Sequence, residues 1–299
     1  MTTVLISGAD GFIAQHAAAN LNALGCRMIG VSIEKKELDY FHSVYEGHLT
    51  SRLKDVFQHE DIDVFIHCAN HSGGDEFRIN VEGTCCWAEQ AKENGVNTQI
   101  FISSLSARKD SASSYGQAKF EIENWFVSHN QFVCRFGLVA GQGGLFRRMM
   151  SQVKKNWLLP LPDAGRIWVY LTDIGHVCQV LKNFVKNENY LERGTVYNFF
   201  QSSPASLKSL MLEIRKQQRT FCLFLPVPSG LLLFALGVVE VLPFSKSNFS
   251  RNNILGMLQN SRLDVHSDFS QFGFSESSVE DMVGRALHAD DGGTDFHSD

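Results

Sequence analysis

The chain has 299 residues, of which 44% are hydrophobic and 20% charged, which is typical of a globular protein with one large domain or two interlocked ones. Its net charge of -5 argues against the broad basic face that nucleic acid binding requires. Seven scattered cysteines lack C-x-x-C spacing, and the histidines show no ligand spacing, so we expect reduced thiols and no metal site.

The first two thirds of the chain alternates short apolar runs with amphipathic segments, which predicts a parallel sheet covered by helices. The predicted strands are Val4–Ser7, Met28–Ile33, Val64–Cys68, Ile100–Ser103, Phe132–Phe136 and Val196–Phe200. The predicted helices between them include Ile13–Leu24, Asn80–Asn94 and Tyr115–His129. Gly25 and Gly95 stand at helix ends, where glycine is favoured because it adopts the left-handed conformation at low cost.

The expected fold class is α/β, a Rossmann-type doubly wound parallel sheet with a smaller, mostly helical C-terminal substrate lobe. We assign residues 1–200 to a dinucleotide-binding domain, with 137–165 contributing to the substrate lobe. Residues 201–288 form the rest of that lobe. Residues 289–299 are acidic and nearly free of apolar side chains, so we expect a disordered tail.

One uncharged stretch, Phe221–Val239, approaches the length of a membrane span. Pro226 and Pro228 interrupt its first half, so we expect a strand or loop ending at Pro228 and then a buried helix from Ser229 to about Val241. This interpretation predicts no membrane contact. Because a strand-like run begins at Thr3, we also expect no signal peptide and a cytoplasmic location.

A glycine-rich turn follows the first predicted strand and opens a helix, the context in which such a turn binds a dinucleotide. Gly8 permits the tight turn, Gly11 lets the backbone approach a pyrophosphate, and Ala14 packs the helix on the sheet. The backbone N–H groups at the start of the helix, near Phe12 and Ile13, would then face the phosphates.

The residue that ends the second predicted strand distinguishes between the two nicotinamide cofactors, because NAD sites place an acid there to bind the ribose diol. Here that residue is Ser32, and Lys35 and Lys36 follow it and can pair with a 2′-phosphate. This favours NADP over NAD. Glu34 can instead fold back and bind the diol, which leaves NAD open.

A serine at a strand end precedes a Tyr-x-x-x-Lys sequence that opens a helix. Tyr115 and Lys119 are four residues apart and project from one face of that helix. The lysine ammonium and a positive nicotinamide ring both favour the phenolate, so Tyr115 can exchange a proton with a substrate hydroxyl or carbonyl. Ser104 would bind the same oxygen by a hydrogen bond.

Five segments resemble, in order, the markers of the extended short-chain dehydrogenase/reductases: GADGFIA, HCA, NVEGT, ISSLSA and YGQAK. That group includes the NAD-dependent sugar epimerases and dehydratases, and the resemblance covers residues 3–175. It implies that Cys68 and Ala69 lie beneath the cofactor, with Tyr115 and Lys119 also in contact with it. Asn80 would support the sheet and the active-site water beside the cofactor.

The resemblance also implies a homodimer through the helices Asn80–Asn94 and Tyr115–His129, and a phosphate-binding role for Arg166. An ion pair with Asp173 or another acid is the alternative role for Arg166. The segment Gly47-His48-Leu49 stands where the family has G-D-L beside the adenine, so His48 and Leu49 are expected there without the usual acid.

We therefore expect an NAD(P)-dependent enzyme that acts on a hydroxyl or ketone of a nucleotide sugar, as a 4-epimerase or a 4-keto reductase. Dehydration is disfavoured because Leu105 and Ser106 follow Ser104 where a dehydratase has carboxylates. Two alternatives stay open, an NADPH-dependent reductase of a hydrophobic or small carbonyl compound and a non-catalytic dinucleotide-binding subunit. Arg166 separates the sugar from the lipid-like substrate, because only a phosphate requires it.

Overall fold

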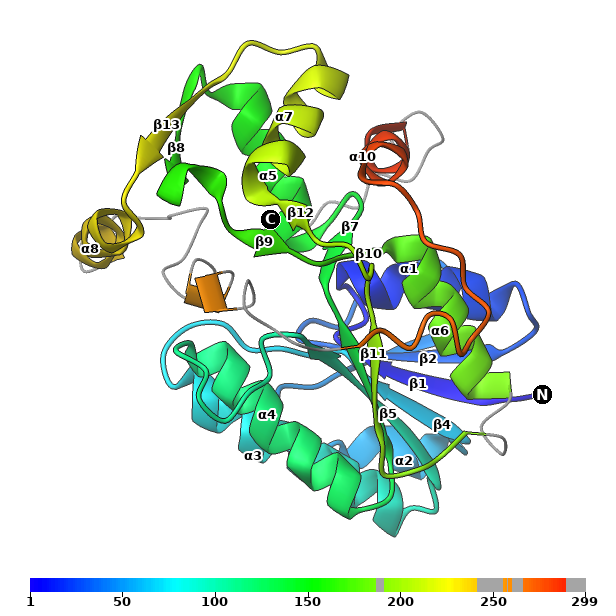
Figure 1. Cartoon of the computed structure of the whole chain (residues 1–299). Helices are drawn as coiled ribbons and strands as arrows, with labels where there is room; N and C mark the ends of the chain where they lie inside the picture. The colour runs from blue at the N-terminus through cyan, green and yellow to red at the C-terminus, as the bar shows by residue number, and fades with distance from the viewer. Residues whose placement is uncertain (187–190, 241–254, 257, 260–265, 289–299) are drawn as a thin grey trace.

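The computed structural model describes residues 1–186, 191–240, 255–256, 258–259 and 266–288, and its centre is a sheet of seven parallel strands (Figure 1). In chain order the strands are β1 (Thr3–Ser7), β2 (Arg27–Ser32), β3 (Ser43–Glu46), β4 (Val64–His67), β5 (Thr98–Ser104), β6 (Phe132–Phe136) and β11 (Val196–Phe199). They are arranged as β11-β6-β5-β4-β1-β2-β3. The order reverses between β1 and β4, which confirms the predicted doubly wound α/β fold.

Helices cover both faces of this sheet (Figure 1). Helices α1 (Phe12–Asn22) and α6 (Ile174–Lys186) pack together on one face, and α3 (Glu76–Glu93) and α4 (Ser114–Ser128) pack together on the other, with α2 (Lys54–His59) beside α3. The strands are therefore buried on both sides, which explains why their sequences are continuous apolar runs rather than alternating ones.

The structure confirms the six predicted strands, with ends within two residues of the expected positions. Gly25 and Gly95 have φ of 80° and 83°, which confirms them as glycines at helix ends. Strand β3 was missed because Ser43–Glu46 is a short, incompletely buried edge strand with little apolar pattern. Helix α3 begins at Glu76, four residues before the predicted start, because the polar residues of its first turn hide the helical period.

The substrate lobe contains α5 (Gly144–Lys155), β8 (Leu158–Pro162), α7 (Leu207–Gln218), β13 (Leu223–Val227) and α10 (Val279–His288). Its own core packs Phe146 and Met149 of α5 against Leu210 of α7 and Met282 of α10. The short strands β7 (Leu138–Ala140) and β10 (Leu171–Asp173) lead from the sheet into the lobe. The exact domain boundaries remain a prediction, and the expected tail at 289–299 lies outside the described residues.

Helix α8 (Ser229–Glu240) begins after Pro228, as predicted, but the prediction that it is buried is wrong. The side chains of Leu231 and Phe234 are 59% and 72% exposed. Figure 1 shows α8 at the outer end of the lobe, where it lies beside β8 rather than between two layers. Among the described residues, no helix combines the length and the apolar character needed to cross a membrane.

Candidate active site

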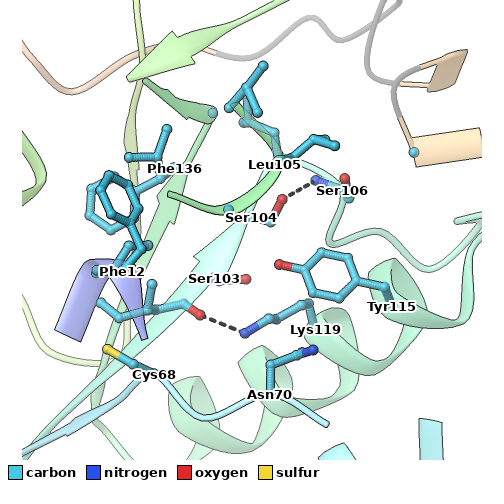
Figure 2. A pocket seen from close by; sticks show the side chains of 18 of the residues that line it. Phe12, Cys68, Asn70, Ser103, Ser104, Leu105, Ser106, Tyr115, Lys119 and Phe136 are labelled. Carbon is cyan, nitrogen blue, oxygen red and sulfur yellow. Dashed lines mark hydrogen bonds between the residues drawn. The ribbon is translucent and has the colours of Figure 1, made fainter. Parts of the chain in front are cut away.

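A cavity of about 400 Å³ lies at the carboxyl ends of the central strands, between the sheet and the lobe. It opens beside the reversal of strand order, where ligands bind in sheets of this type. Three groups of side chains line it, from the glycine-rich turn, from the ends of β4 and β5 with α4, and from the lobe. Figure 2 shows Ser104, Tyr115 and Lys119 around this space, with Phe12 and Cys68 on another side.

The glycine-rich turn has the shape that the sequence predicted. Gly8 has a φ of 67°, and a Cβ on it would lie 3.0 Å from the Cα of Ala69. The backbone N–H of Gly11 donates to the Gly8 carbonyl at 2.8 Å, which closes the turn, and α1 begins at the next residue. Ala14 is fully buried between helix and sheet. The N-terminus of α1 therefore faces the cavity across a turn in which Gly8 and Gly11 carry no side chain, which fits a pyrophosphate.

The end of β4 is held to the end of β1 by a single hydroxyl. Ser7 Oγ accepts hydrogen bonds from the backbone N–H groups of Cys68 at 3.1 Å and Ala69 at 3.2 Å. Cys68 lines the cavity, and burial raises the pKa of its thiol to about 12, so it stays a neutral thiol. Asn80 does not line the cavity; its side chain binds the backbone of His71 at 2.8 Å in both directions and so shapes the loop after β4.

Helix α4 places Tyr115 and Lys119 on one side of the cavity (Figure 2). The helix starts where it does because Ser113 Oγ caps it, accepting from the N–H of Gly116 at 3.1 Å. A Cβ on Gly116 would lie 2.3 Å from the Ser106 carbonyl, so only glycine lets the helix approach this closely. One turn later, Lys119 Nζ donates to the Ile102 carbonyl of β5 at 2.8 Å.

Burial governs the proton affinities of these two side chains. It lowers the pKa of Lys119 to about 8, so the side chain is still mostly an ammonium at neutral pH. Burial raises the pKa of Tyr115 to about 12, although a hydrogen bond with Ser104 opposes the shift. Within the protein alone Tyr115 is therefore a phenol, and the predicted lowering of its pKa needs a further positive charge next to it.

The two serines at the end of β5 have different roles. Ser103 Oγ donates to Glu123 Oε1 at 2.5 Å, and Glu123 also forms a two-pronged ion pair with Arg135. This buried cluster supports the floor of the site. Ser104 is hydrogen-bonded to Tyr115 instead, and its Oγ accepts from the N–H of Ser106 at 3.2 Å (Figure 2). The structure therefore brings together the three residues that the sequence singled out, Ser104, Tyr115 and Lys119.

Residues 4–131 match the model of the NAD dependent epimerase/dehydratase family. This part of the chain belongs to that family. The matched residues run from β1 to the residue before β6, so the family match contains the glycine-rich turn and all three of Ser104, Tyr115 and Lys119. No curated protein matches the chain significantly.

Solved structures of epimerases and dehydratases share the fold over nearly the whole chain. A dTDP-glucose 4,6-dehydratase from Bacillus anthracis in complex with NAD aligns with a TM-score of 0.72 and 14% identity, covering 99% of this chain and 98% of its own. The UDP-glucose 4-epimerase of Thermotoga maritima with UDP-glucose gives 0.69 and 14%, covering 96% and 98%. The UDP-glucose 4-epimerase of Bifidobacterium longum in complex with NAD⁺ and UDP gives 0.67 and 15%, covering 96% and 97%.

The residues expected at the adenine end of this epimerase/dehydratase domain lie outside the cavity lining. Ser32 is buried, and its hydroxyl donates to the backbone carbonyl of Glu34. Lys36 forms an exposed ion pair with Asp10 of the glycine-rich turn at 3.1 Å, while Lys35 is simply exposed. His48 Nδ1 lies 2.7 Å from Thr50 Oγ1, and the neighbouring Leu49 is buried.

Arg166 is exposed and does not line the cavity. Asp173 is not its ion-pair partner, because Asp173 binds Arg285 of α10 at 2.7 Å. The lobe instead lines the cavity with residues that sequence reasoning did not select, because glycines and apolar side chains carry no chemical signature. These lining residues, which follow β6 or precede β10, are Gly137, Leu138, Val139, Gly143, Gly144, Leu145, Trp168, Val169 and Tyr170.

Proposed function

We propose that this protein is a nicotinamide dinucleotide-dependent enzyme that interconverts a hydroxyl and a ketone on a nucleotide sugar, as a 4-epimerase or a 4-keto reductase. One observation carries the proposal. Tyr115, Lys119 and Ser104 line the same cavity as the glycine-rich turn at the start of α1. A proton-transfer group and a dinucleotide site in one cavity are the two parts that hydride chemistry on an alcohol requires.

The side chains have separable roles in this chemistry. Tyr115 Oη would exchange a proton with the substrate oxygen, and Ser104 Oγ would bind that oxygen as its charge changes. Lys119, anchored to the Ile102 carbonyl, supplies a fixed positive charge next to the phenol. A bound oxidised nicotinamide ring would supply the hydride acceptor and the further positive charge that favours the phenolate.

The composition of the cavity argues against an elimination step. Dehydration needs an acid and a base next to the oxidised carbon. Among the described residues that line the cavity there is no aspartate or glutamate. Leu105 and Ser106, which follow Ser104, are both in the lining and carry no carboxylate. This supports epimerisation or keto reduction over dehydration.

The solved structures of similar fold support a nucleotide sugar, since one contains UDP-glucose and another contains NAD⁺ and UDP. NADP remains the favoured cofactor in this proposal, on the grounds of Ser32 and Lys35. The ion pair between Lys36 and Asp10 works against it, because Asp10 already neutralises one of the two expected partners of a 2′-phosphate. Homodimerisation through α3 and α4 and a cytoplasmic location also remain predictions.

A reductase of a hydrophobic or small carbonyl compound is the second candidate, and the lobe side of the cavity favours it. Leu138, Leu145 and Trp168 make this wall apolar. Among the described lining residues, Lys119 is the only charged side chain, whereas a diphosphate is usually held by arginine.

The deciding experiment begins with mass spectrometry of nucleotide released from the denatured protein, followed by titration of the stripped protein with NAD(H) and NADP(H). Turnover is then followed by NMR with UDP-glucose and UDP-N-acetylglucosamine, and by NADPH oxidation with aliphatic and aromatic ketones. Stoichiometric bound NAD together with interconversion of the sugars supports an epimerase. Reduction of the ketones alone supports the second candidate, and failure to bind any dinucleotide contradicts both.

A further inference from the structure

The outer face of the lobe carries a concentration of exposed, large apolar side chains. Twelve such side chains are exposed among the described residues, and seven of them fall within residues 157–158 and 221–234. A random scatter would not place more than half of them in two short segments. We call this surface the lobe patch; its members are Trp157, Leu158, Phe221, Leu223, Leu225, Leu231 and Phe234.

The lobe patch is continuous because its segments are neighbours in the fold. Strand β13 pairs in parallel with β8, with Leu223 opposite Leu158, and the N–H of Leu223 donates to the Trp157 carbonyl at 2.8 Å. Along β13, Leu223 and Leu225 face outward while Phe224 between them packs on the lobe core.

Helix α8 extends this surface. The N–H of Ser229, its first residue, donates to Asp163 Oδ1 just after β8 at 2.8 Å. The helix also packs against β8, at the outer end of the lobe (Figure 1). Leu231 and Phe234 lie three residues apart, so they project from the same side of the helix, and both are exposed. The exposed apolar side chains of the ribbon and of the helix are thus carried by neighbouring elements.

The same part of the lobe is strongly basic. Residues 144–163 and 205–240, which include α5, α7 and α8, hold eight of the 27 lysines and arginines of the chain but three of its 32 acidic residues, in a protein of net charge -5. Lys154 and Lys155 precede Trp157, and Arg219 precedes Phe221; all three are exposed. The apolar side chains are thus flanked by positive charge.

This combination decides between the possible occupants of the lobe patch. In a symmetric contact between two copies of the chain, the positive surface of one copy would face the positive surface of the other, and this repulsion is unfavourable. A bilayer with anionic headgroups attracts lysine and arginine and accepts exposed aromatic and leucine side chains at its interface. We propose that the lobe patch docks this protein on the surface of an anionic lipid bilayer.

This docking does not depend on the proposed chemistry, because the members of the lobe patch do not line the cavity. The expectation that the 221–239 stretch avoids membranes required a buried helix. The exposure of Leu231 and Phe234 removes that reason.

The test is co-sedimentation of the full chain with phosphatidylcholine vesicles, with and without phosphatidylglycerol. We expect binding to the anionic vesicles that weakens as salt is added. Phe221→Ser combined with Phe234→Ser should lower the vesicle affinity at least about tenfold. The matched control is Phe77→Ser, at an exposed phenylalanine of α3 in the other half of the molecule.

A second pair of variants tests the charge. Lys154→Gln with Lys155→Gln should lower affinity for the anionic vesicles, whereas Lys54→Gln with Lys92→Gln, at two exposed lysines of α2 and α3, should not. The unmodified patch can be tested as well, because brominated lipids should quench the fluorescence of Trp157 and this quenching should disappear in Trp157→Phe. Dinucleotide affinity should stay unchanged in every one of these variants.

Three results would overturn the proposal. The first is that the wild-type chain does not bind anionic vesicles. This result overturns the proposal whether light scattering shows a monomer or shows a dimer that is dissociated by Phe221→Ser with Phe234→Ser. The second is an equal loss of binding in Phe77→Ser. The third is binding that ignores both salt and the lysine substitutions. Because vesicle binding is measured without turnover, either proposal can fail while the other stands.

Discussion

The two halves of the molecule differ in how far their large apolar side chains are exposed. In the half built on the seven-stranded sheet, Phe65, Phe101 and Phe126 are fully buried between sheet and helices. In the lobe, Phe221 and Phe234 are exposed by 73% and 72%. A parallel sheet with helices on both faces leaves no apolar face free. The two-stranded β8–β13 ribbon is covered on one face among the described residues, so its other face is available for contact with something else.

The two halves also differ in the kinds of side chain that they contribute to the cavity. The ionisable side chains that line the cavity come from the sheet half, among them Tyr115 and Lys119, with the exception of Tyr170. In the same half, Ser103 forms a buried hydrogen bond with Glu123. The lobe supplies glycines, apolar side chains and Tyr170. We infer that the sheet half determines the reaction type and that the lobe determines which molecule reaches it.

The largest expected effect is on kcat, and it distinguishes two tyrosines that both line the cavity, Tyr115 of the sheet half and Tyr170 of the lobe. Tyr115→Phe should lower kcat about 10²- to 10⁴-fold, the usual contribution of a positioned proton donor, with dinucleotide affinity nearly intact. Tyr170→Phe removes the same atom from the lobe wall and should change KM more than kcat. Steady-state kinetics and calorimetric titration of both variants measure this, and a fully active Tyr115→Phe protein would reject the assignment.

The next effect concerns the buried cluster beneath Ser104. Glu123 accepts from Ser103 and pairs with Arg135, and its side chain is 3% exposed. Glu123→Gln leaves the half-buried Arg135 without its counter-charge and should lower the free energy of unfolding by about 3 kcal/mol, measured by urea denaturation. Two controls should leave stability unchanged, Glu121→Gln at an exposed site of α4 and Glu280→Gln in the exposed lobe pair with Lys216. Equal losses in all three would remove the contrast between the halves.

The sheet half could be predicted from sequence because its elements each carry a local signal. Buried strands are short apolar runs, Gly8 and Gly11 mark the turn, and the four-residue spacing of Tyr115 and Lys119 places both on one side of a helix. These signals agree with one another, so strand positions and the grouping of Ser104 with Tyr115 both emerged correctly.

The lobe was less predictable for a physical reason. Its apolar stretch from Phe221 onward contains leucine and phenylalanine on every side, so the pattern does not show which side chains face the core and which face outward. Whether Leu231 is buried depends on the number of layers around α8, and that depends on tertiary packing. Arg166 was misplaced for a similar reason, because its motif fixes its position in the chain and not the direction of its side chain.

A smaller effect is the pH dependence of the free energy of unfolding that one histidine of the sheet half causes. His67 is buried between Phe65 and Phe126 and bonded to Gln99 at 2.9 Å, and burial lowers its pKa from 6.5 to about 3. Between these two values the unfolded chain binds a proton that the folded chain does not. Its contribution to stability is therefore complete above pH 6.5 and is lost as the pH falls toward 3.

The slope from this group approaches about 1.4 kcal/mol per pH unit within that window. Denaturation curves of the wild type and of His67→Leu, taken from pH 7 to pH 4, measure it. We expect the variant to be less stable at pH 7, because it loses the bond to Gln99, and to have the shallower pH dependence. Parallel slopes for the two proteins would show that His67 is not the group responsible.

The smallest expected effect is that of Phe221→Ala, and it is measured against the same substitution at a second phenylalanine of the lobe. Phe146 is fully buried in the lobe core, so Phe146→Ala should cost about 3–5 kcal/mol of unfolding free energy. Phe221→Ala removes the same atoms from an exposed site and should change stability by less than about 0.5 kcal/mol. If Phe221→Ala also destabilises by several kcal/mol, that ring has partners within the chain. The lobe patch would then be part of the core, and the docking surface would disappear with it.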